Sequence, residues 1–316
     1  MTPRHFCTYF DSNYLPRALA LYHSLRQHAG DFTLDVLCLD SLTCDILTAL
    51  KLPGVNLLTL RELEADDFAL VQAKQNRSWL EYIWTLTPSL IIHSQKRATC
   101  AVVTYLDADL YFYSSPEPVF DEFAEASIML IPHRFARRAE VAAQRNGVFN
   151  VGMMAFRKDA EGHAALNWWR HQCLSACHAE PSGGKFGDQK YLDDWPVRFR
   201  GVKIISHKGA NLAPWNISGY CITRDNGVLR VDGDRLVFYH FHKLDILGEW
   251  WFRSGVRLKR RHIQLVYTPY VRALGGAYRE LRQVQPNFRA GFSKLNLGLV
   301  ANWILRRQLT FLRVSI

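Results

Sequence analysis

The sequence predicts an α/β protein whose strands and helices alternate around a doubly wound sheet. Short apolar runs, rich in Val, Ile, Tyr and Phe, alternate with longer segments in which apolar residues recur at helical spacing. One of these apolar runs, residues 101–106, leads directly to two carboxylates, Asp107 and Asp109. The 316 residues, of which 48% are hydrophobic, suffice for one large domain or for a domain with an extension.

The first strand is expected over residues 4–10, and the helix after it has an apolar stripe along residues 15–28. Further strands are predicted over residues 33–39, 55–60, 101–106, 127–132, 149–156, 202–206 and 236–241. Further helices are predicted over residues 40–50, 78–95 and 160–177, with a short one beginning at Gly187. In such sheets ligands bind at the edge formed by the carboxyl ends of the strands, where we expect the functional residues.

The net charge of +10 is concentrated near the C-terminus. From Arg253 onward there are 13 Lys and Arg residues and one acid, whereas the preceding part of the chain is almost neutral. The pattern beyond residue 244 is interpreted as helical and basic. We therefore divide the chain into a main domain, residues 1–250, and a basic helical extension, residues 251–316.

The composition of this extension is typical of segments that contact an anionic membrane surface. Its first part combines aromatic and basic side chains: Trp250, Trp251, Phe252, Arg257, Lys259, Arg260 and Arg261. Residues 292–312 form a second apolar and basic segment. The alternative is a helical cap on the main domain whose charges are simply solvated. Because the tail lacks a known recognition motif, no nucleic acid is expected as a partner.

Other features of the sequence indicate a cytoplasmic protein. No uninterrupted run of 18 apolar residues is present, so no membrane-spanning helix is expected. The first residues lack the apolar core of a signal peptide. The seven cysteines are an odd number and most lie in apolar runs, which is typical of reduced thiols. We expect a cytoplasmic location, at the inner face of the membrane if the tail binds lipid.

Asp107 and Asp109 are the most informative residues of the chain. Residues two apart on an extended chain point the same way, so both carboxylates can face one point at the end of the strand. Two converging carboxylates are suited to Mg²⁺ or Mn²⁺ that carries a diphosphate. The alternative is an ordinary surface turn, in which Asp is common.

A second motif lies in the strand 149–156, where Asn150 is followed by Gly152. Glycine in an apolar strand allows a ligand to approach the backbone closely. The Asn150 amide can donate to one sugar hydroxyl and accept from another. The alternative is a β-bulge with a buried, hydrogen-bonded Asn.

The third motif is the pair Asp188 and Gln189 after a glycine-rich loop. A functional interpretation places both side chains at the sugar or at the reacting centre. In the alternative, Asp188 only caps the N-terminus of a short helix.

The fourth motif is the histidine pair His240 and His242, which follows a late apolar strand. Histidines at i and i+2 lie on one face, and one neutral imidazole would complete a Mn²⁺ shell beside two carboxylates and a diphosphate. A buried core histidine is the alternative.

Together these motifs resemble a metal-dependent glycosyltransferase of the GT-A fold, in particular glycosyltransferase family 8 and its bacterial relatives. The similarity spans residues 4 to 250. The stretch LDADLYF is similar to the metal-binding Asp-x-Asp of the family. FNVGMM is similar to its Asn-Ser-Gly, with Val151 in place of Ser, and Asp188-Gln189 resembles its Asp-Gln pair.

The resemblance also implies which residues bind the donor. It implies that Thr8, Asp11 and Tyr14, in the stretch TYFDSNY, hold the base and ribose of the nucleotide. The stretch 76–88, NRSWLEYIWTLTP, is similar to a segment of related bacterial sequences, which implies that Arg77 contacts the donor phosphate or sugar.

The sequence departs from the family pattern after His240. Family 8 typically has His-Phe-x-Gly-x-x-Lys-Pro-Trp, but no Lys-Pro pair follows here. We rank His240 first as the third metal ligand beside Asp107 and Asp109, His242 second, and His207, which precedes a Pro-Trp pair, third. The candidates to hold the leaving diphosphate are Lys208, Lys243 and Arg253.

The activity implied by the resemblance is transfer of a sugar from a nucleotide-diphosphate sugar, with a UDP-sugar favoured, to an acceptor hydroxyl. Mn²⁺ or Mg²⁺ is the implied cofactor, and retention of configuration is the implied outcome. With the basic tail, a glycan or lipid-linked acceptor follows, as in lipopolysaccharide or capsule assembly.

Other classes of protein fit the sequence less well. A nucleotidyltransferase that makes sugar nucleotides would have a glycine-rich basic loop after the first strand, where residues 11–16 read DSNYLP. A phosphatase with an Asp-x-Asp-x-Thr motif would have Thr at the position of Tyr111. A non-catalytic relative, acting as a scaffold or binding membranes or nucleic acid, would have no need of the intact Asp pair.

Overall fold

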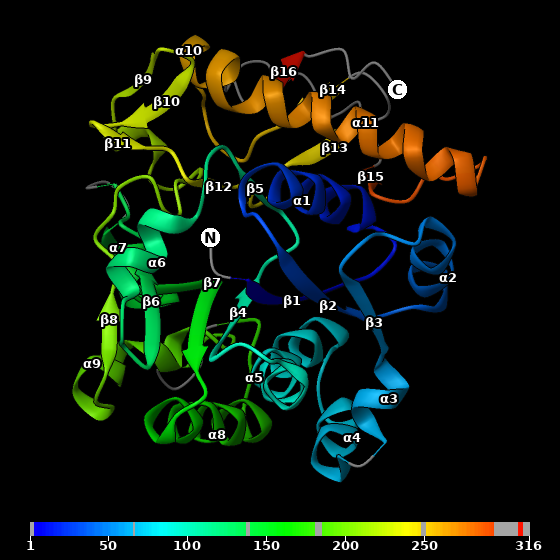
Figure 1. Cartoon of the computed structure of the whole chain (residues 1–316), viewed down its shortest axis with the longest axis vertical. Helices are drawn as coiled ribbons and strands as arrows, with labels where there is room; N and C mark the ends of the chain where they lie inside the picture. The colour runs from blue at the N-terminus through cyan, green and yellow to red at the C-terminus, as the bar shows by residue number, and fades with distance from the viewer. Residues whose placement is uncertain are drawn as a thin grey trace.

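The computed structural model describes residues 3–65, 67–136, 140–180, 185–247, 251–293 and 309–311. A mixed seven-stranded sheet runs through the molecule in the order β3-β2-β1-β4-β7-β6-β8 (Figure 1). Its strands are β1 (Arg4–Phe10), β2 (Phe32–Cys38), β3 (Val55–Thr59), β4 (Val102–Leu106), β6 (Ile128–Pro132), β7 (Phe149–Arg157) and β8 (Val202–Ile204). The strands predicted from the sequence are confirmed to within about two residues over this sheet.

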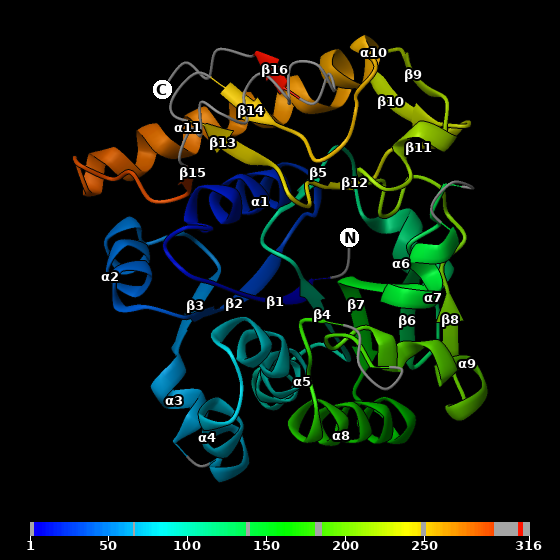
Figure 2. The same cartoon turned by 180° about the vertical axis from the view of Figure 1, so that it is seen from behind.

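Helices cover both faces of this sheet, as the predicted α/β fold class requires. α1 and α11 lie on one side, and α5 and α8 lie on the other (Figures 1 and 2). The helices are α1 (Leu15–His28), α2 (Ser41–Leu50), α3 (Leu60–Glu64), α4 (Phe68–Gln75), α5 (Trp79–Arg97), α6 (Glu117–Phe123), α7 (Glu140–Asn146), α8 (Ala160–Ser175), α9 (Trp195–Arg198), α10 (Arg260–His262) and α11 (Thr268–Val284). Short 3-10 turns are η2 (Lys190–Asp194) and η3 (Ile217–Gly219), and η4 (Ile263–Tyr267) is a π-helical segment.

The direction of β7 decides which residues reach the edge of the sheet formed by the carboxyl ends of β1 to β4. This edge is called the functional edge below. β1, β2, β3 and β4 are parallel, but β7 runs antiparallel to β4, with Leu106 opposite Met153. The beginning of β7 therefore lies beside the end of β4. For this reason Asn150 and Gly152, near the start of their strand, lie at the same edge as Asp107.

Three smaller sheets complete the fold. A two-stranded sheet pairs β5 (Leu110–Phe112) with β12 (Phe238–His240), so that His240 lies opposite Leu110. β9 (Ile222–Asp225), β10 (Val228–Val231) and β11 (Asp234–Arg235) form a meander. The fourth sheet, in the order β15-β13-β14-β16, contains β13 (Asp245–Leu247), β14 (Trp251–Arg253), β15 (Phe292–Ser293) and β16 (Leu309–Phe311).

The C-terminal region differs from the helical extension predicted. Residues 245–247 and 251–253 form strands β13 and β14 rather than a helix. α11 packs on α1, and its buried residues share one hydrophobic core with β1 and α1, so this core continues across residue 250. The boundary at residue 250 stays a prediction. Trp250 and most of residues 292–312 lie outside the described residues.

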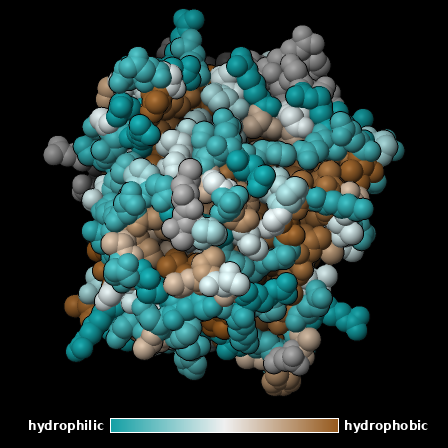
Figure 3. All heavy atoms as spheres, viewed as in Figure 1, coloured by the Kyte–Doolittle hydropathy of each residue, from teal (hydrophilic) through white to brown (hydrophobic). Residues whose placement is uncertain are grey.

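No helix in the described ranges has both the length and the apolar character required to cross a membrane. On the face seen in Figure 3, hydrophilic residues cover most of the surface, and smaller hydrophobic groups lie between them.

A buried hydrogen-bonded group of side chains joins the first three strands at the end opposite the Asp pair. His5 Nε2 lies 2.8 Å from Asp35 Oδ2, and Asn56 Nδ2 donates to Asp35 Oδ1 at 2.9 Å. Burial alone raises the pKa of Asp35, but the hydrogen bonds from His5 and Asn56 outweigh it and hold this pKa below its usual value. The carboxylate is thus ionised in the core and depends on these partners.

Replacing Asp35 by Ala should lower the free energy of unfolding at pH 7 by about 3–5 kcal/mol, because His5 and Asn56 then lose their partner in a buried site. Urea denaturation measures this change. The exposed Asp31 provides the matched control, and Asp31→Ala should change stability by no more than about 0.5 kcal/mol. Equal effects of the two substitutions would contradict the assignment.

Candidate metal and donor site

The two carboxylates follow β4 in a turn that is held by the neighbouring strands. The Asp107 N–H donates to the Gly152 carbonyl at 2.8 Å, and the Phe241 N–H donates to the Asp109 carbonyl at 3.0 Å. The Tyr105 hydroxyl donates to Asp107 Oδ1 at 2.8 Å. Backbone bonds from β7 and from the segment after β12 therefore fix the position of both acids.

His240, at the end of β12, brings an imidazole to these carboxylates. Its Nε2 lies 3.1 Å from Asp109 Oδ1 and 3.6 Å from Asp107 Oδ2. The ligand atoms of Asp109, His240 and His242 all lie within 4.8 Å of one another. Neighbouring ligands of an octahedral ion with bonds of about 2.1 Å lie about 3 Å apart, so this oxygen and nitrogen set fits Mn²⁺ or Mg²⁺.

The charges in this cluster are strongly coupled. Burial alone lowers the pKa of His240, but Asp109 and Asp107 outweigh burial and raise it. Burial raises the pKa of Asp107, whereas the proximity of His240 holds the pKa of Asp109 below its usual value despite burial. A metal ion must displace the proton on the imidazole, so metal binding here releases a proton.

Behind His240 lies Asn150, whose amide is engaged within the protein. Asn150 Oδ1 accepts from the Gly152 N–H at 3.0 Å and lies 3.3 Å from His240 Nδ1, and Nδ2 lies 3.3 Å from His133 Nε2. The side chain is buried, so the structure places it against His240, where the sequence interpretation expected a sugar hydroxyl. A contact between Asn150 and a sugar hydroxyl stays a prediction.

Gly152 is required by the close approach of His240 to β7. A Cβ on residue 152 would lie 2.8 Å from His240 Nδ1 and 2.6 Å from Asn150 Oδ1. The close approach that the sequence suggested for this glycine is therefore with the imidazole of His240.

Asp188 lies on the opposite side of the sheet edge, held by α5 and α8. Its Oδ2 accepts from the Thr87 hydroxyl at 2.9 Å, and Trp169 Nε1 donates to its carbonyl at 2.8 Å. Burial, with a smaller contribution from Asp107, raises the pKa of Asp188 to about 7. The carboxylate contacts Thr87 rather than capping a helix. Gln189 Nε2 donates to the Asn146 carbonyl at 2.6 Å.

The residues expected at the nucleotide lie in different environments. Asp11 Oδ1 accepts from the N–H groups of Asn13 and Tyr14 and so shapes the loop before α1. Tyr14 is 45% exposed, and partial removal from water together with nearby Asp109 raises its pKa to about 12. Both residues remain at the functional edge.

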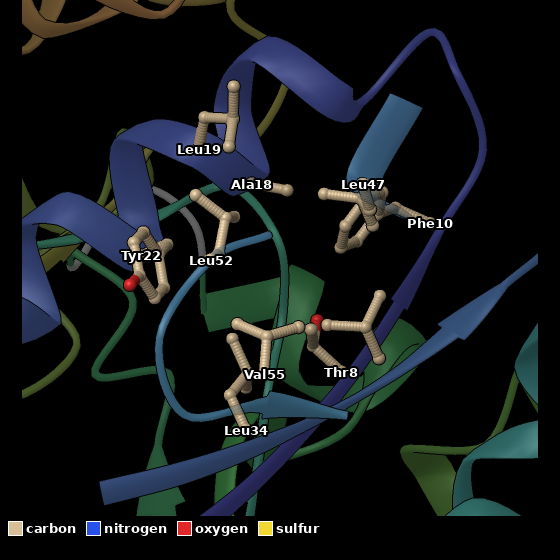
Figure 4. A pocket seen from close by; sticks show the side chains of 10 residues that line it. Thr8, Phe10, Ala18, Leu19, Tyr22, Leu34, Leu47, Leu52 and Val55 are labelled. Atoms are coloured by element: carbon tan, nitrogen blue, oxygen red, sulfur yellow. The ribbon is translucent and has the colours of Figure 1, made fainter. Parts of the chain in front are cut away.

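Thr8 does not reach this edge. Its side chain faces a cavity of about 10 Å³ between β1 and helices α1 and α2, which is lined by apolar side chains such as Phe10 and Val55 (Figure 4). The residue is buried in the core. The expected contact of Thr8 with the base or ribose stays a prediction.

Arg77 is engaged in a structural contact. Its guanidinium donates to the carbonyls of Cys173 and Leu174 at the end of α8, at 2.8 and 2.7 Å, and to the Thr85 hydroxyl at 2.8 Å. These bonds satisfy carbonyls that a helix end leaves without partners. Arg77 thus caps α8 in this structure, and its contact with donor phosphate or sugar stays a prediction.

The remaining candidates for contact with the diphosphate or the metal ion lie in different parts of the structure. Lys243 is exposed next to His242, in a loop with φ of 54°. Lys208 Nζ lies 3.5 Å from Asp232, and Arg253 Nε donates to Asp245 at 2.7 Å. His207 accepts from the Gly209 N–H through Nδ1 and lies outside the cluster of Asp109, His240 and His242.

Two residues of the site were missed by sequence analysis. Arg17, on α1, is buried, donates to the carbonyls of Asn13 and Leu244, and its charge helps to lower the pKa of Asp109. Nothing in a single sequence marks this arginine, because it lies within an otherwise ordinary helix. His133 follows β6 directly. Its place at the end of a predicted strand could have marked it as a candidate site residue in the sequence.

Comparison with known proteins shows the family. The chain is 32% identical to YfnD of Bacillus subtilis (strain 168) in an alignment of 301 residues that covers 92% of this chain and 95% of YfnD. It is 30% identical to YfnF of the same organism in an alignment of 299 residues that covers 92% of this chain and 97% of YfnF. The chain belongs to the family of YfnD and YfnF. No protein-family model matches the sequence.

This member of the YfnD and YfnF family has the fold of a GT-A glycosyltransferase. The solved structure of the galactosyltransferase LgtC, in complex with donor and acceptor sugar analogs, matches with a TM-score of 0.55 and 15% identity. The match covers 86% of this chain and 95% of LgtC. The predicted fold class is confirmed, and so is the resemblance to GT-A glycosyltransferases at the level of fold.

The raised pKa of Asp188 predicts a pH dependence of stability. Between about pH 4 and pH 7 the unfolded chain has released this proton and the folded chain still holds it, so stability falls as pH rises. Asp188→Asn keeps an acceptor for Thr87 and removes this titration. In urea denaturation with EDTA, the variant should therefore gain stability relative to wild type from pH 4 to 7. Parallel curves for both proteins would contradict the assignment.

Proposed function

We propose that this protein transfers a sugar from a nucleotide-diphosphate sugar to an acceptor hydroxyl, with a divalent metal ion and with retention of configuration. A UDP-sugar is the favoured donor. The observation that carries the proposal is the meeting of Asp107, Asp109 and His240 at the functional edge of a GT-A sheet. LgtC, which shares this fold, was solved with donor and acceptor sugar analogs, and this supports the substrate class.

Asp107, Asp109 and His240 would hold the metal ion, and His242 is close enough to join or replace one of them. Bound Mn²⁺ or Mg²⁺ supplies Lewis-acid stabilisation for the charge that develops on the leaving diphosphate. The protein fixes these side chains in advance through backbone bonds to β7 and β12, so little reorganisation is needed when the ligand binds.

The donor would extend from this cluster toward α1. Asp11 and Tyr14 lie in the loop that leads into α1 and are suited to contact the ribose and base. Arg17 binds the Leu244 carbonyl and so ties this loop to the segment that contains His242 and Lys243. Lys243 is exposed, and its ammonium group could contact the leaving diphosphate.

Asp188 would act on the sugar side of the cluster. Its buried carboxyl is held by Thr87, which is itself 3.1 Å from the Tyr9 hydroxyl. A carboxyl with a pKa of about 7 can donate a hydrogen bond to a sugar hydroxyl or, when ionised, stabilise positive charge at the anomeric carbon. Gln189 would orient the same sugar.

The acceptor is proposed to be a glycan or a lipid-linked glycan at an anionic membrane. Exposed cations around the start of α10 support this: Arg257, Lys259, Arg260 and Arg261. Such clusters attract anionic lipid by about 1 kcal/mol for each cation near the surface. On this proposal the protein would act at the inner face of the membrane, in polysaccharide or lipopolysaccharide assembly.

Replacing either Asp107 or Asp109 by Asn should abolish metal-dependent transfer, because the ion then loses an anionic ligand. We expect turnover to fall by about 100-fold or more, as for loss of a key electrostatic group. The assay is release of the nucleoside diphosphate from UDP-, GDP- and dTDP-sugars, and of CMP from CMP-sugars, with and without Mn²⁺. Release of pyrophosphate from a sugar phosphate and a nucleoside triphosphate would instead identify a nucleotidyltransferase.

The exposed acid Asp121, on α6, provides the matched control. Asp121→Asn should keep wild-type turnover, and thermal unfolding should show that all three variants are folded. Full turnover of Asp107→Asn or Asp109→Asn in the presence of metal would overturn the proposed function.

A further inference from the structure

A buried chain of hydrogen bonds runs from His133 to Nδ1 of His240, the ring nitrogen that does not face the carboxylates. His133 lies just after β6, and its ring is buried between the Val148 carbonyl and Asn150. Asn150 in turn contacts His240. These residues, His133, Asn150 and His240, are called the histidine chain below.

The donor and the acceptor of each hydrogen bond in the histidine chain can be assigned from the backbone groups that contact it. The Val148 carbonyl can only accept, so His133 Nδ1, 3.3 Å away, must carry a proton. The Gly152 N–H can only donate, so the Asn150 atom that it contacts at 3.0 Å must be the oxygen. The Asn150 amide nitrogen therefore donates to His133 Nε2, at 3.3 Å.

The same reasoning fixes the proton on His240. Asn150 Oδ1 can only accept, so His240 Nδ1 must donate to it across 3.3 Å. In the neutral ring, the lone pair is then on Nε2, which faces Asp109 at 3.1 Å and Asp107 at 3.6 Å. This is the tautomer that can bind a metal ion beside the carboxylates.

The position of His133 is itself well determined. Phe135 stacks on its ring with the ring centroids 4.6 Å apart. Trp215 Nε1 and Asn216 Nδ2 both donate to its carbonyl at 2.8 Å. Burial lowers the pKa of His133 to about 3, so the ring stays neutral and keeps a lone pair for Asn150.

We propose that His133 is a positioning residue that, through Asn150, fixes the ring orientation and tautomer with which His240 binds the metal ion. This inference rests on the metal site of the proposed function. Residues behind a histidine ligand commonly hold its other nitrogen, and their loss weakens metal binding by about 10–100-fold.

The test compares Mn²⁺ affinity, measured from the EPR signal of free Mn²⁺, among the wild type, His133→Leu and His133→Gln. Leu removes the acceptor for the Asn150 amide, whereas Gln can supply its side-chain oxygen at that place. We expect Kd to rise by about 10–100-fold in His133→Leu and to stay within about threefold of wild type in His133→Gln.

A second readout follows the tautomer directly. In ¹⁵N-histidine NMR of the metal-free protein, at a pH high enough to make the His240 ring neutral, the His240 signals should report protonated Nδ1 in the wild type and mixed tautomers in His133→Leu. His240→Gln assigns those signals by their loss. His262, a buried histidine of α10, supplies the control, and His262→Leu should leave Mn²⁺ affinity unchanged.

Wild-type Mn²⁺ affinity in His133→Leu would overturn the inference, and so would equal weakening in the Leu and Gln variants. If thermal unfolding shows that His133→Leu does not fold, Asn150→Ala takes its place, with the same expected loss. A wild-type protein that binds no Mn²⁺ would instead overturn the proposed function, so the two failures are distinguishable.

Discussion

The site depends on one close contact, the packing of the His240 ring against the backbone of β7 at Gly152. A side chain at residue 152 would overlap the imidazole, and His240 could then no longer lie over the end of β4. From this position its Nε2 reaches both carboxylates, and its Nδ1 faces Asn150. The absence of one Cβ therefore allows three separate segments of the chain to meet.

The antiparallel direction of β7 makes this contact possible. It brings the beginning of β7 beside the end of β4, where the Asp107 N–H binds the Gly152 carbonyl. The pairing of β5 with β12 then delivers His240 to the same point. On the other side, α5 and α8 hold Asp188 in a buried environment that keeps its pKa near 7. The metal ligands and the buried acid are thus held by different elements: the ligands by β4, β7 and β12, and Asp188 by α5 and α8.

Local patterns predicted those parts of the fold and site that depend on neighbouring residues. The strand 101–106 and the two acids after it could be recognised because a short apolar run and the charges that follow it are visible within a few residues. Other features could not be recognised, because each depends on contacts with distant segments: the direction of β7, the strands β13 and β14, and the burial of Arg17. Thr8 shows the same limit. The resemblance implied that it contacts the nucleotide, and only the packing of the folded chain shows that its side chain is buried in the core.

The central claim is that His240 and the two carboxylates bind one metal ion. Pulsed EPR of the protein loaded with Mn²⁺ and UDP tests it most directly, because it detects nuclei bound to the ion. In a His242→Ala background, which removes the neighbouring imidazole, we predict ¹⁴N coupling from the directly bound His240 imidazole, which is lost when His240→Ala is added, together with ³¹P coupling from the diphosphate. Bound Mn²⁺ without ¹⁴N coupling, or with coupling that persists when His240→Ala is added to His242→Ala, would contradict it.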